Sequence, residues 1–191
     1  MRLCYRVGRM TQGALIAVRN LPSLSVDVSE LLRRPGASES VQIDRALSGI
    51  EVPLARVRDD SALHVDVRLE SLVDGIHVSG RVRGAAGVEC RRCLKDLDVP
   101  LEVGLDEVFL YPGDAGDDDA YAVTGEEIDL EPAVRDAVML ALPLNPLCME
   151  TCRGLCSTCG ADLNETDCGH SQDPVDIRWT GLEQLRRTLE E

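Results

Sequence analysis

The feature that most constrains this chain is a run of five cysteines in a segment with few core-forming residues. The run and the residues that follow it read Cys148-x3-Cys152-x3-Cys156-x2-Cys159-x8-Cys168-Gly169-His170. It lies between Pro143 and Pro174, where neither a helix nor a strand has enough apolar residues to pack. Two thiols in C-x2-C spacing can point both sulfurs toward one tetrahedral zinc ion, with Zn–S distances of about 2.3 Å. The sequence therefore predicts a structural zinc site that holds this segment together in place of a hydrophobic core.

The expected zinc ligands come from this run. Cys156 and Cys159 form its C-x2-C pair, and Gly160 directly after them suits the positive φ that a tight knuckle needs. Gly154, just before the pair, allows the backbone to enter closely. The expected set of four is Cys152, Cys156, Cys159 and Cys168, with Cys148 and His170 as alternates.

A second C-x2-C motif, Cys90-Arg91-Arg92-Cys93, stands apart from the run and leaves three interpretations open. It is a separate pair, or it joins Cys156 and Cys159 in a split zinc ribbon, or it is a thiol redox site activated by its arginines. We favour the local ligand set because closing a shorter loop costs less conformational entropy. The redox interpretation is weaker, since strands and not a βαβ unit are expected on both sides of the motif.

Composition and charge exclude several function classes. Aromatic residues make up only 3% of the chain, too few for a surface of stacked bases, and a net charge of −14 excludes phosphate binding over the whole surface. Residues 1–93 hold 14 Arg and 11 acidic residues for a net charge of +3, whereas residues 94–191 hold 6 basic and 23 acidic residues for −17. The asymmetry predicts two surfaces with different partners, although an acidic half that only maintains solubility is an equal alternative.

No apolar segment reaches the length of about 18 residues that a membrane span needs. The longest candidate runs from Ala137 to Leu144 and contains Pro143, and the apolar residues 14–18 are too few for a signal-peptide core. We therefore expect a cytoplasmic protein, in which thiols stay reduced and bind metal rather than form disulfides.

Period-2 alternation predicts an antiparallel hairpin in the middle of the chain. Apolar residues alternate with polar ones from Leu63 to Leu69 and again from Ile76 to Val82, and Asp74-Gly75 supplies the turn. Further strands are expected over residues 52–57 and 99–111. The Cys90–Cys93 motif then falls at a tight connection between two strands.

Two helices are expected in the acidic half. The first follows Asp129, carries Pro132 in its first turn and ends at Pro143. Its apolar face is predicted to consist of Val134, Val138, Ala141 and Leu142. A short second helix is expected from Asp176, with an apolar stripe that begins at Trp179.

The expected fold class is α+β, with an antiparallel twisted or barrel-like sheet followed by a helix, a Cys-rich zinc-binding loop and a C-terminal helix. The expected organisation is a β domain over residues 1–111 that carries the first C-x2-C motif, and an acidic linker over residues 112–127. Residues 128–191 then form the helix, the zinc-binding cluster and the terminal helix, packed on the β domain.

Five short motifs follow one another along the chain. They are Glu89-Cys90-Arg91-Arg92-Cys93-Leu94, Leu105-Asp106-Glu107-Val108-Phe109, Ile128-Asp129-Leu130, Leu140-Ala141-Leu142-Pro143-Leu144-Asn145-Pro146-Leu147-Cys148 and Gly154-Leu155-Cys156-Ser157-Thr158-Cys159-Gly160-Ala161-Asp162-Leu163-Asn164. In this order they resemble the YceD family of large ribosomal RNA subunit accumulation proteins, over about residues 50–191. The resemblance implies a role in maintaining large-subunit (23S) ribosomal RNA, with that RNA or the pre-ribosomal large subunit as partner.

The sequence contains no recognisable catalytic motif, and a thiolate-rich zinc site is structural far more often than catalytic, so we expect no enzyme activity. One form of a non-enzymatic role places RNA phosphates on an arginine-bearing face. The candidate contacts are Arg56, Arg58, Arg68, Arg81, Arg83, Arg91 and Arg92. In the other form an acidic surface binds a basic ribosomal protein. Its candidate residues are Asp114, Asp117, Asp118, Asp119, Glu126 and Glu127. A solvated sheet face without a partner is the plain alternative for the arginines.

Overall fold

The computed structural model describes residues 17–18, 24–112 and 120–170 of the chain. Its contacts divide the chain into two compact units, which we call the sheet unit (residues 1–88 and 97–144) and the cysteine unit (residues 89–96 and 145–191). All seven cysteines among the described residues belong to the cysteine unit. The linker residues 113–119 and the helix expected from Asp176 lie outside the described residues.

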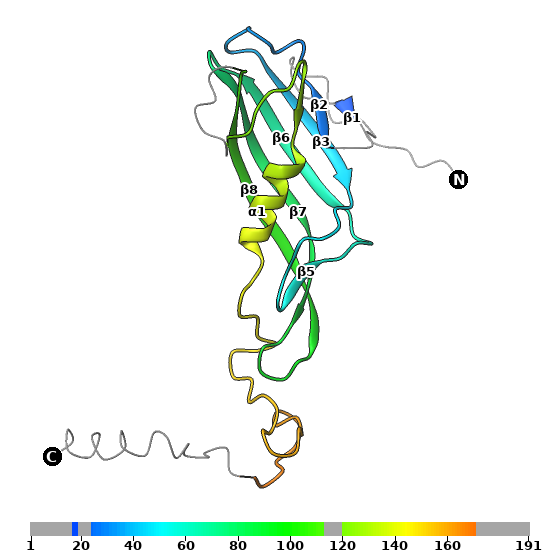
Figure 1. Ribbon diagram of the computed structural model, residues 1–191. Helices are drawn as coiled ribbons and strands as arrows, with labels where there is room; N and C mark the ends of the chain where they lie inside the picture. The colour runs from blue at the N-terminus through cyan, green and yellow to red at the C-terminus, as the bar shows by residue number, and fades with distance from the viewer. Residues whose placement is uncertain (1–16, 19–23, 113–119, 171–191) are drawn as a thin grey trace, which may run out of the picture. The chain divides into compact units, whose positions relative to one another are not determined.

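The sheet unit contains one mostly antiparallel sheet of seven strands (Figure 1). The strands are β1 (Ala17–Val18), β3 (Ser38–Arg45), β4 (Glu51–Val52), β5 (Ala55–Val57), β6 (Leu63–Ser71), β7 (Gly75–Glu89) and β8 (Asp96–Leu110). Their order is β1-β3-β6-β7-β5-β4, and β8 pairs with β7. β1 runs parallel to β3, whereas β3, β5, β6 and β7 form antiparallel pairs.

The hairpin of β6 and β7 confirms the prediction from period-2 alternation. Every second residue of β6 from Leu63 to Ser71 is buried, and the residues between are exposed or half-buried. Leu69 lies opposite Val78, so the buried faces of both strands are in register. Because side chains of a strand alternate between faces, this register places the apolar residues of both strands in one core.

The strand expected over residues 52–57 is instead two short strands. β4 and β5 form a tight hairpin in which Val52 lies opposite Ala55. Pro53 sits between them, and because proline has no N–H to donate and a fixed φ, it favours a turn over a continuous ladder. β5 then pairs with the second half of β7, with Ala55 opposite Val88.

The one helix in the described part of the sheet unit is α1 (Glu131–Ala141), close to where the sequence predicts it. The Asp129 carboxylate accepts a hydrogen bond from the Glu131 N–H at 2.9 Å, which satisfies one of the free donors at the helix start. The helix buries Ala133, Val134 and Val138, while Ala141, expected on the same face, is exposed. Ala141 is the last residue of the helix, and the apolar face continues instead with Leu142 just after it, which is buried.

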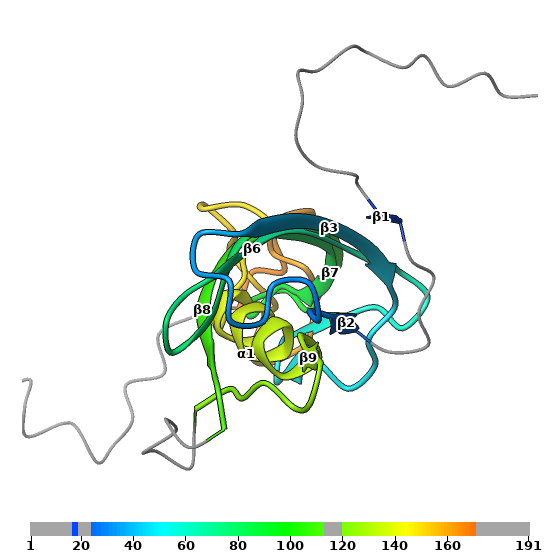
Figure 2. The same cartoon turned by 90° about the horizontal axis from the view of Figure 1, so that it is seen from above.

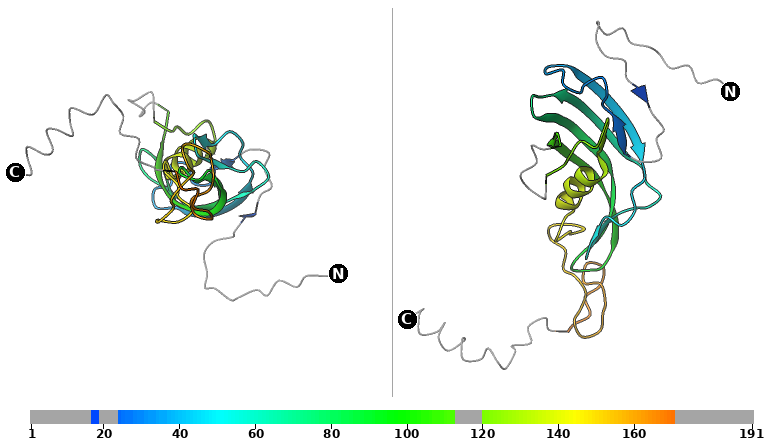
Figure 3. Two further views of the ribbon diagram at one scale, coloured as in Figure 1. Left: turned by 90° about the horizontal axis from the view of Figure 1, so that it is seen from below. Right: turned by 45° about the horizontal axis from the view of Figure 1, so that its top comes forward.

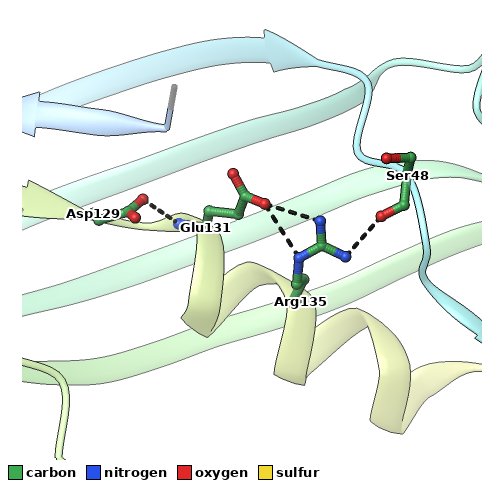
Figure 4. A network of polar contacts seen from close by, with 4 residues as sticks. All are labelled: Ser48, Asp129, Glu131 and Arg135. Atoms are coloured by element: carbon green, nitrogen blue, oxygen red, sulfur yellow. Dashed lines mark hydrogen bonds and ion pairs between the residues drawn. The ribbon is translucent and has the colours of Figure 1, made fainter. Parts of the chain in front are cut away.

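Polar contacts tie the start of α1 to the rest of the sheet unit (Figure 4). The Arg135 guanidinium donates to Glu131 at 2.9 and 3.2 Å and to the Ser48 carbonyl at 2.8 Å. Just before the helix, β9 (Glu127–Asp129) pairs antiparallel with β2 (Ser25–Asp27) in a separate two-stranded sheet. These contacts fix the helix against a loop and a strand that are distant in sequence.

The sheet curves round α1 but stays open (Figures 2 and 3). Among the described residues no strand pair joins β8 to the strands at the ends of the order, so the barrel-like expectation is wrong in that no closed barrel forms. The space between helix and sheet is filled by fully buried apolar side chains. The largest are Phe109, Leu24, Ile50, Leu63, Leu69, Ile76, Ile128 and Leu130. By their contacts, β9 and α1 belong to the sheet unit.

Candidate metal centres

The cysteine unit brings seven cysteines and one histidine together as two groups of four. The first group is Cys90, Cys93, Cys148 and Cys152, and the second group is Cys156, Cys159, Cys168 and His170. Within each group the sulfur or ring nitrogen atoms all lie within 4.8 Å of one another. Each group therefore offers the four soft donors that one tetrahedral metal ion requires.

The first group has the dimensions of a tetrahedral thiolate site. The Cys90 and Cys152 sulfurs lie 3.8 Å apart, and the Cys93 and Cys148 sulfurs lie 3.6 Å apart. Four sulfurs at about 2.3 Å from one ion are separated by about 3.8 Å, whereas a disulfide would place two of them about 2.05 Å apart. Cys90, Cys93 and Cys152 are only 0%, 8% and 2% exposed. The donors thus surround a buried position suited to one ion.

The second group is more open and has a mixed donor set. The Cys156 sulfur lies 3.8 Å from Nδ1 of His170. Cys156 is buried, Cys168 is half-buried, and both Cys159 and His170 are exposed. Three sulfurs and one ring nitrogen are a common donor set of structural zinc sites.

Both C-x2-C motifs form the same turn. In the first, the Cys90 N–H donates to the Lys95 carbonyl at 2.9 Å and the Leu94 N–H donates to the Cys90 carbonyl at 2.9 Å. In the second, the Cys156 N–H donates to the Ala161 carbonyl at 2.8 Å and the Gly160 N–H donates to the Cys156 carbonyl at 2.9 Å. Each turn points two sulfurs in one direction, so each provides half of a tetrahedral site.

The residue after each motif has a left-handed backbone. Gly160 has φ of 73°, as its position in the sequence predicts, and Leu94 has φ of 59° at the equivalent place in the first turn. Gly154 has φ of 78°, and a Cβ there would lie 3.0 Å from the Arg92 carbonyl oxygen. The close backbone approach predicted for Gly154 is thereby confirmed, and it brings the two turns of the cysteine unit side by side.

The electrostatics of the first group favour a bound cation. Burial raises the pKa of the Cys90 thiol, but hydrogen bonds from backbone N–H groups, that of Cys93 first, outweigh burial and lower the pKa to about 6. Burial and the adjacent Cys152 thiol raise the pKa of Cys148 to about 12. The backbone can thus stabilise one thiolate here, and several thiolates together require a positive ion between them.

The second group follows the same logic. Hydrogen bonds from the backbone N–H groups of Cys159 and Thr158 lower the pKa of Cys156 to about 6. The His170 N–H lowers the pKa of Cys168, but the neighbouring Cys156 sulfur and burial outweigh it and raise that pKa. One thiolate is again stabilised by the turn, and the second is disfavoured until a cation is present.

Asn164 ties one sulfur of the first group to the neighbouring chain through hydrogen bonds. Its Nδ2 donates to the Cys152 sulfur at 3.5 Å and to the Asp162 carboxylate at 2.7 Å, and its Oδ1 accepts from the Arg153 N–H at 2.7 Å. The Arg92 guanidinium donates to the Cys152 carbonyl at 2.7 Å. Such outer contacts orient the ligands of metal sites.

The structure does not bring the expected set of four ligands together. Cys156, Cys159 and Cys168 lie in one group with the alternate His170, but Cys152 lies in the other group with the alternate Cys148. The split ribbon of Cys90 and Cys93 with Cys156 and Cys159 is not formed either. A count of the candidate ligands could have predicted this division into two groups. The two C-x2-C motifs supply four cysteines, and the four further candidates complete two sets of four.

The candidate RNA contacts in the sheet unit are largely engaged with acidic side chains. Arg81 and Arg83 both contact Glu102, at 3.1 and 3.4 Å. Arg58 contacts Asp60 at 3.0 Å and Asp98 at 3.7 Å. Exposed arginines also stand on the same sheet at Arg56 and at Arg68, and Arg68 donates to the Ser38 hydroxyl at 2.6 Å. This face is a mixed-charge surface rather than a positive stripe.

The two arginines of the first C-x2-C turn have neutral partners instead. Arg91 donates to the Asn145 side chain at 3.0 Å, and Arg92 donates to a backbone carbonyl. Both are exposed. Of the acidic candidates, Glu126 and Glu127 are exposed, and the remainder, Asp114, Asp117, Asp118 and Asp119, lie outside the described residues.

Fold and site define a mostly antiparallel β protein with a cysteine-rich unit that could hold metal ions. The chain belongs to the YceD family, because the family model described as large ribosomal RNA subunit accumulation protein YceD matches residues 78–186. Among curated relatives, Rv2926c of Mycobacterium tuberculosis is 36% identical over 168 residues, which cover 85% of this chain and 81% of the relative. YlbN of Bacillus subtilis is 26% identical over 138 residues, which cover 71% of this chain and 80% of the relative.

A plant relative carries a functional name. The large ribosomal RNA subunit accumulation protein YCED homolog 1, chloroplastic, of Arabidopsis thaliana is 32% identical over 66 residues, which cover 35% of this chain and 21% of the relative. No solved structure matches the chain. Within the described part of the chain, no helix is both long and apolar enough to cross a membrane.

Proposed function

We propose that this protein supports the synthesis, processing or stability of large-subunit (23S) ribosomal RNA, without enzymatic activity of its own. The observation that carries the proposal is the family match over residues 78–186, which includes the whole stretch from the first C-x2-C turn to His170. The name of that family describes accumulation of an RNA and not a reaction.

The proposal assigns zinc to the cysteine unit as a structural metal. Sulfur-rich tetrahedral donor sets select zinc or iron, and a site with four protein ligands leaves no open position for substrate. A cytoplasmic location agrees with this assignment, because its reducing conditions keep thiols available for metal.

For RNA contact, the proposal favours the arginines of the first C-x2-C turn over those of the sheet. Phosphate would have to displace Glu102 to reach Arg81 or Arg83. Arg91 and Arg92 have neutral partners, and among the described residues no carboxylate forms an ion pair with either of them. A phosphate group could therefore bind these two without breaking an ion pair.

A second candidate function is binding of a basic ribosomal protein before it joins the subunit. The net charge of −17 over residues 94–191 is the observation that favours it. Charge complementarity of this kind steers association and keeps a basic partner from binding RNA prematurely.

The proposed function is tested by depletion of the protein, followed by ribosome sedimentation and separate quantitation of both ribosomal RNAs. We expect a selective loss of the large-subunit RNA, restored by the wild-type gene. An unchanged ratio of the two RNAs in depleted cells would overturn the proposal.

The two candidate partners are separated by crosslinking in cells that carry charge variants. If RNA is the direct partner through the first turn, Arg91→Gln with Arg92→Gln removes crosslinks to RNA, and the matched pair Arg81→Gln with Arg83→Gln retains most of them. If a basic protein is the partner, RNA crosslinks survive both pairs, and neutralising Asp117, Asp118 and Asp119 releases that protein in pull-downs. Binding through phosphates also weakens steeply as salt rises.

A further inference from the structure

We infer that the cysteine unit holds two zinc ions per chain, one in each group of four, and that the two ions are not equivalent. The inference rests on the zinc binding proposed above and is independent of the RNA role. The juxtaposition that carries it is two complete tetrahedral donor sets, built on two copies of the same turn, within one small unit.

The division of ligands follows from geometry. Cys152 and Cys156 are four residues apart in the chain, yet the Cys152 sulfur lies 3.8 Å from that of Cys90, while the Cys156 sulfur lies 3.8 Å from the His170 ring. A single ion on the local cysteines would draw Cys152 away from this position. It would also leave Cys90, Cys93 and Cys148 with only three of the four donors that a tetrahedral zinc site takes.

The residues near the first group are more positive than those near the second, and the first group's ligands would carry the larger negative charge. Four thiolates on one Zn²⁺ carry a net charge of −2, and the charged residues within two positions of those ligands have a net charge of +2. They are Arg91, Arg92, Lys95 and Arg153, with Glu89 and Glu150. Three thiolates and a neutral imidazole carry −1, and the residues beside them include Glu165 and Asp167. Because basic neighbours offset the larger negative charge, the first group is the better match for an ion held by sulfur alone.

Access to the two ions also differs. The first group is enclosed, with Cys90 fully buried and the Asn164 amide on the Cys152 sulfur. The second group exposes two of its four ligands, Cys159 and His170. A chelator or competing metal therefore reaches the second ion first, and the first ion exchanges slowly because the unit must open before it is released.

The test uses the full chain, purified anaerobically with reductant, and measures metal by elemental analysis and by the visible spectrum after Co²⁺ replacement. We expect about two zinc ions per chain, and a cobalt spectrum that is the sum of an all-sulfur site and a site with three sulfurs and one nitrogen. A chelator should remove the ions in two phases. About one ion per chain, or iron as the bound metal, would overturn the inference.

Substitutions assign each phase to its group. His170→Cys should keep about two ions and convert the mixed cobalt spectrum to an all-sulfur one, and this variant keeps a complete donor set. Cys152→Ser should change only the slowly released, all-sulfur ion, and Cys159→Ser only the fast one. Cys4→Ser, outside both groups, is the matched control and should change neither.

The decisive outcome is the behaviour of the Cys152 variant. If Cys152→Ser alters the mixed-donor spectrum and leaves the other unchanged, the division of ligands inferred here is wrong, whatever the stoichiometry. Should a variant lose its fold, the wild-type stoichiometry and the His170→Cys spectrum still decide. If the protein binds two ions but its depletion leaves large-subunit RNA unchanged, the proposed function is wrong and the inference of two zinc ions stands.

Discussion

The two units of this chain are stabilised in different ways. The sheet unit buries a large apolar cluster that includes Phe109, Leu69 and Ile128. Among the described residues of the cysteine unit, the buried apolar side chains are those of four cysteines, Pro146 and Leu163. Burial of apolar surface is the main favourable term in folding, so the cysteine unit has little of what stabilises the sheet unit.

The contrast predicts that the cysteine unit depends on bound metal and that the sheet unit does not. In a unit without an apolar core, the free energy of binding metal is in effect the free energy of folding.

Removal of metal should unfold one unit and spare the other. A structural zinc ion contributes about 10–16 kcal/mol of apparent binding free energy in small domains, far above what the core of the cysteine unit supplies. After chelation we expect residues 89–96 and 145–170 to lose amide protection in hydrogen exchange, while strands β6 and β7 keep theirs. Equal loss in both units, or loss in neither, would contradict the contrast.

Truncation of a side chain in the sheet core should destabilise the sheet unit and leave the metal content of the cysteine unit unchanged. Phe109 is 1% exposed in β8, so Phe109→Ala leaves a cavity and should cost about 3–5 kcal/mol of unfolding free energy in denaturant titrations. Metal content per chain should not change. The matched control is Val108→Ala at the adjacent position, where the side chain is 38% exposed and the cost should stay near 0.5 kcal/mol. A metal-depleted Phe109→Ala protein would show that the units are not independent.

Loss of one outer contact should weaken one ion without removing it. Asn164→Ala deletes the amide that donates to the Cys152 sulfur, and loss of such a contact typically lowers metal affinity about 10–100-fold. Competition with a chelating indicator should register the change. Asn145→Ala is the control, because the Asn145 side chain accepts a hydrogen bond from Arg91 and, within the described part of the chain, makes none to a sulfur. Equal affinities in the two variants would remove Asn164 from the site.

Alkaline pH should weaken the sheet unit through Tyr121. Burial, followed by the 2.7 Å hydrogen bond to Asp136, raises the pKa of Tyr121 to about 12 from about 10 in the unfolded chain. The folded state therefore holds this proton more tightly, so the stabilisation is complete below pH about 10 and is lost as pH rises toward about 12. The effect is the smallest of the four, because solvent screens a half-buried group.

The measurement for Tyr121 is the unfolding free energy of the sheet unit across this pH range. Tyr121→Phe should flatten the dependence, and Tyr111→Phe should retain it. A Tyr121→Phe protein with the wild-type slope would assign the alkaline transition to another group.

Most elements of the fold that were predicted correctly were predicted from patterns in a few consecutive residues. Alternation over Leu63–Leu69 is enough to define a half-buried strand, because the side-chain period of a strand is fixed by backbone geometry. The turn at Gly160 and the start of α1 after Asp129 were equally local. The break at Pro53 was missed because the apolar residues on both sides of this single proline suggested one continuous strand. The exposure of Ala141 was missed because its spacing from Val134 and Val138 suggested the same apolar face, although it stands at the end of the helix.

Pairing over long distances could not be predicted in this way. Loop-closure entropy favoured ligands close in sequence, yet Cys90 and Cys152 are 62 residues apart and in contact. Residues 97–144 of the chain between them belong to the sheet unit, which includes β9, α1 and nearly all of β8. The entropy of closing that distance is already lost when the sheet unit folds, so the penalty does not fall on the metal site.

Short stretches of the sequence are enough to identify the residues that can bind metal, the turns that place their sulfurs and the strands that bury one face, since each of these depends on a few consecutive residues. Only the tertiary structure decided that Cys148 and Cys152 complete the first turn's group and that Arg81 and Arg83 face Glu102. The physical reason is that a partner across space is chosen by the folding of everything between, and no short stretch of sequence contains that information.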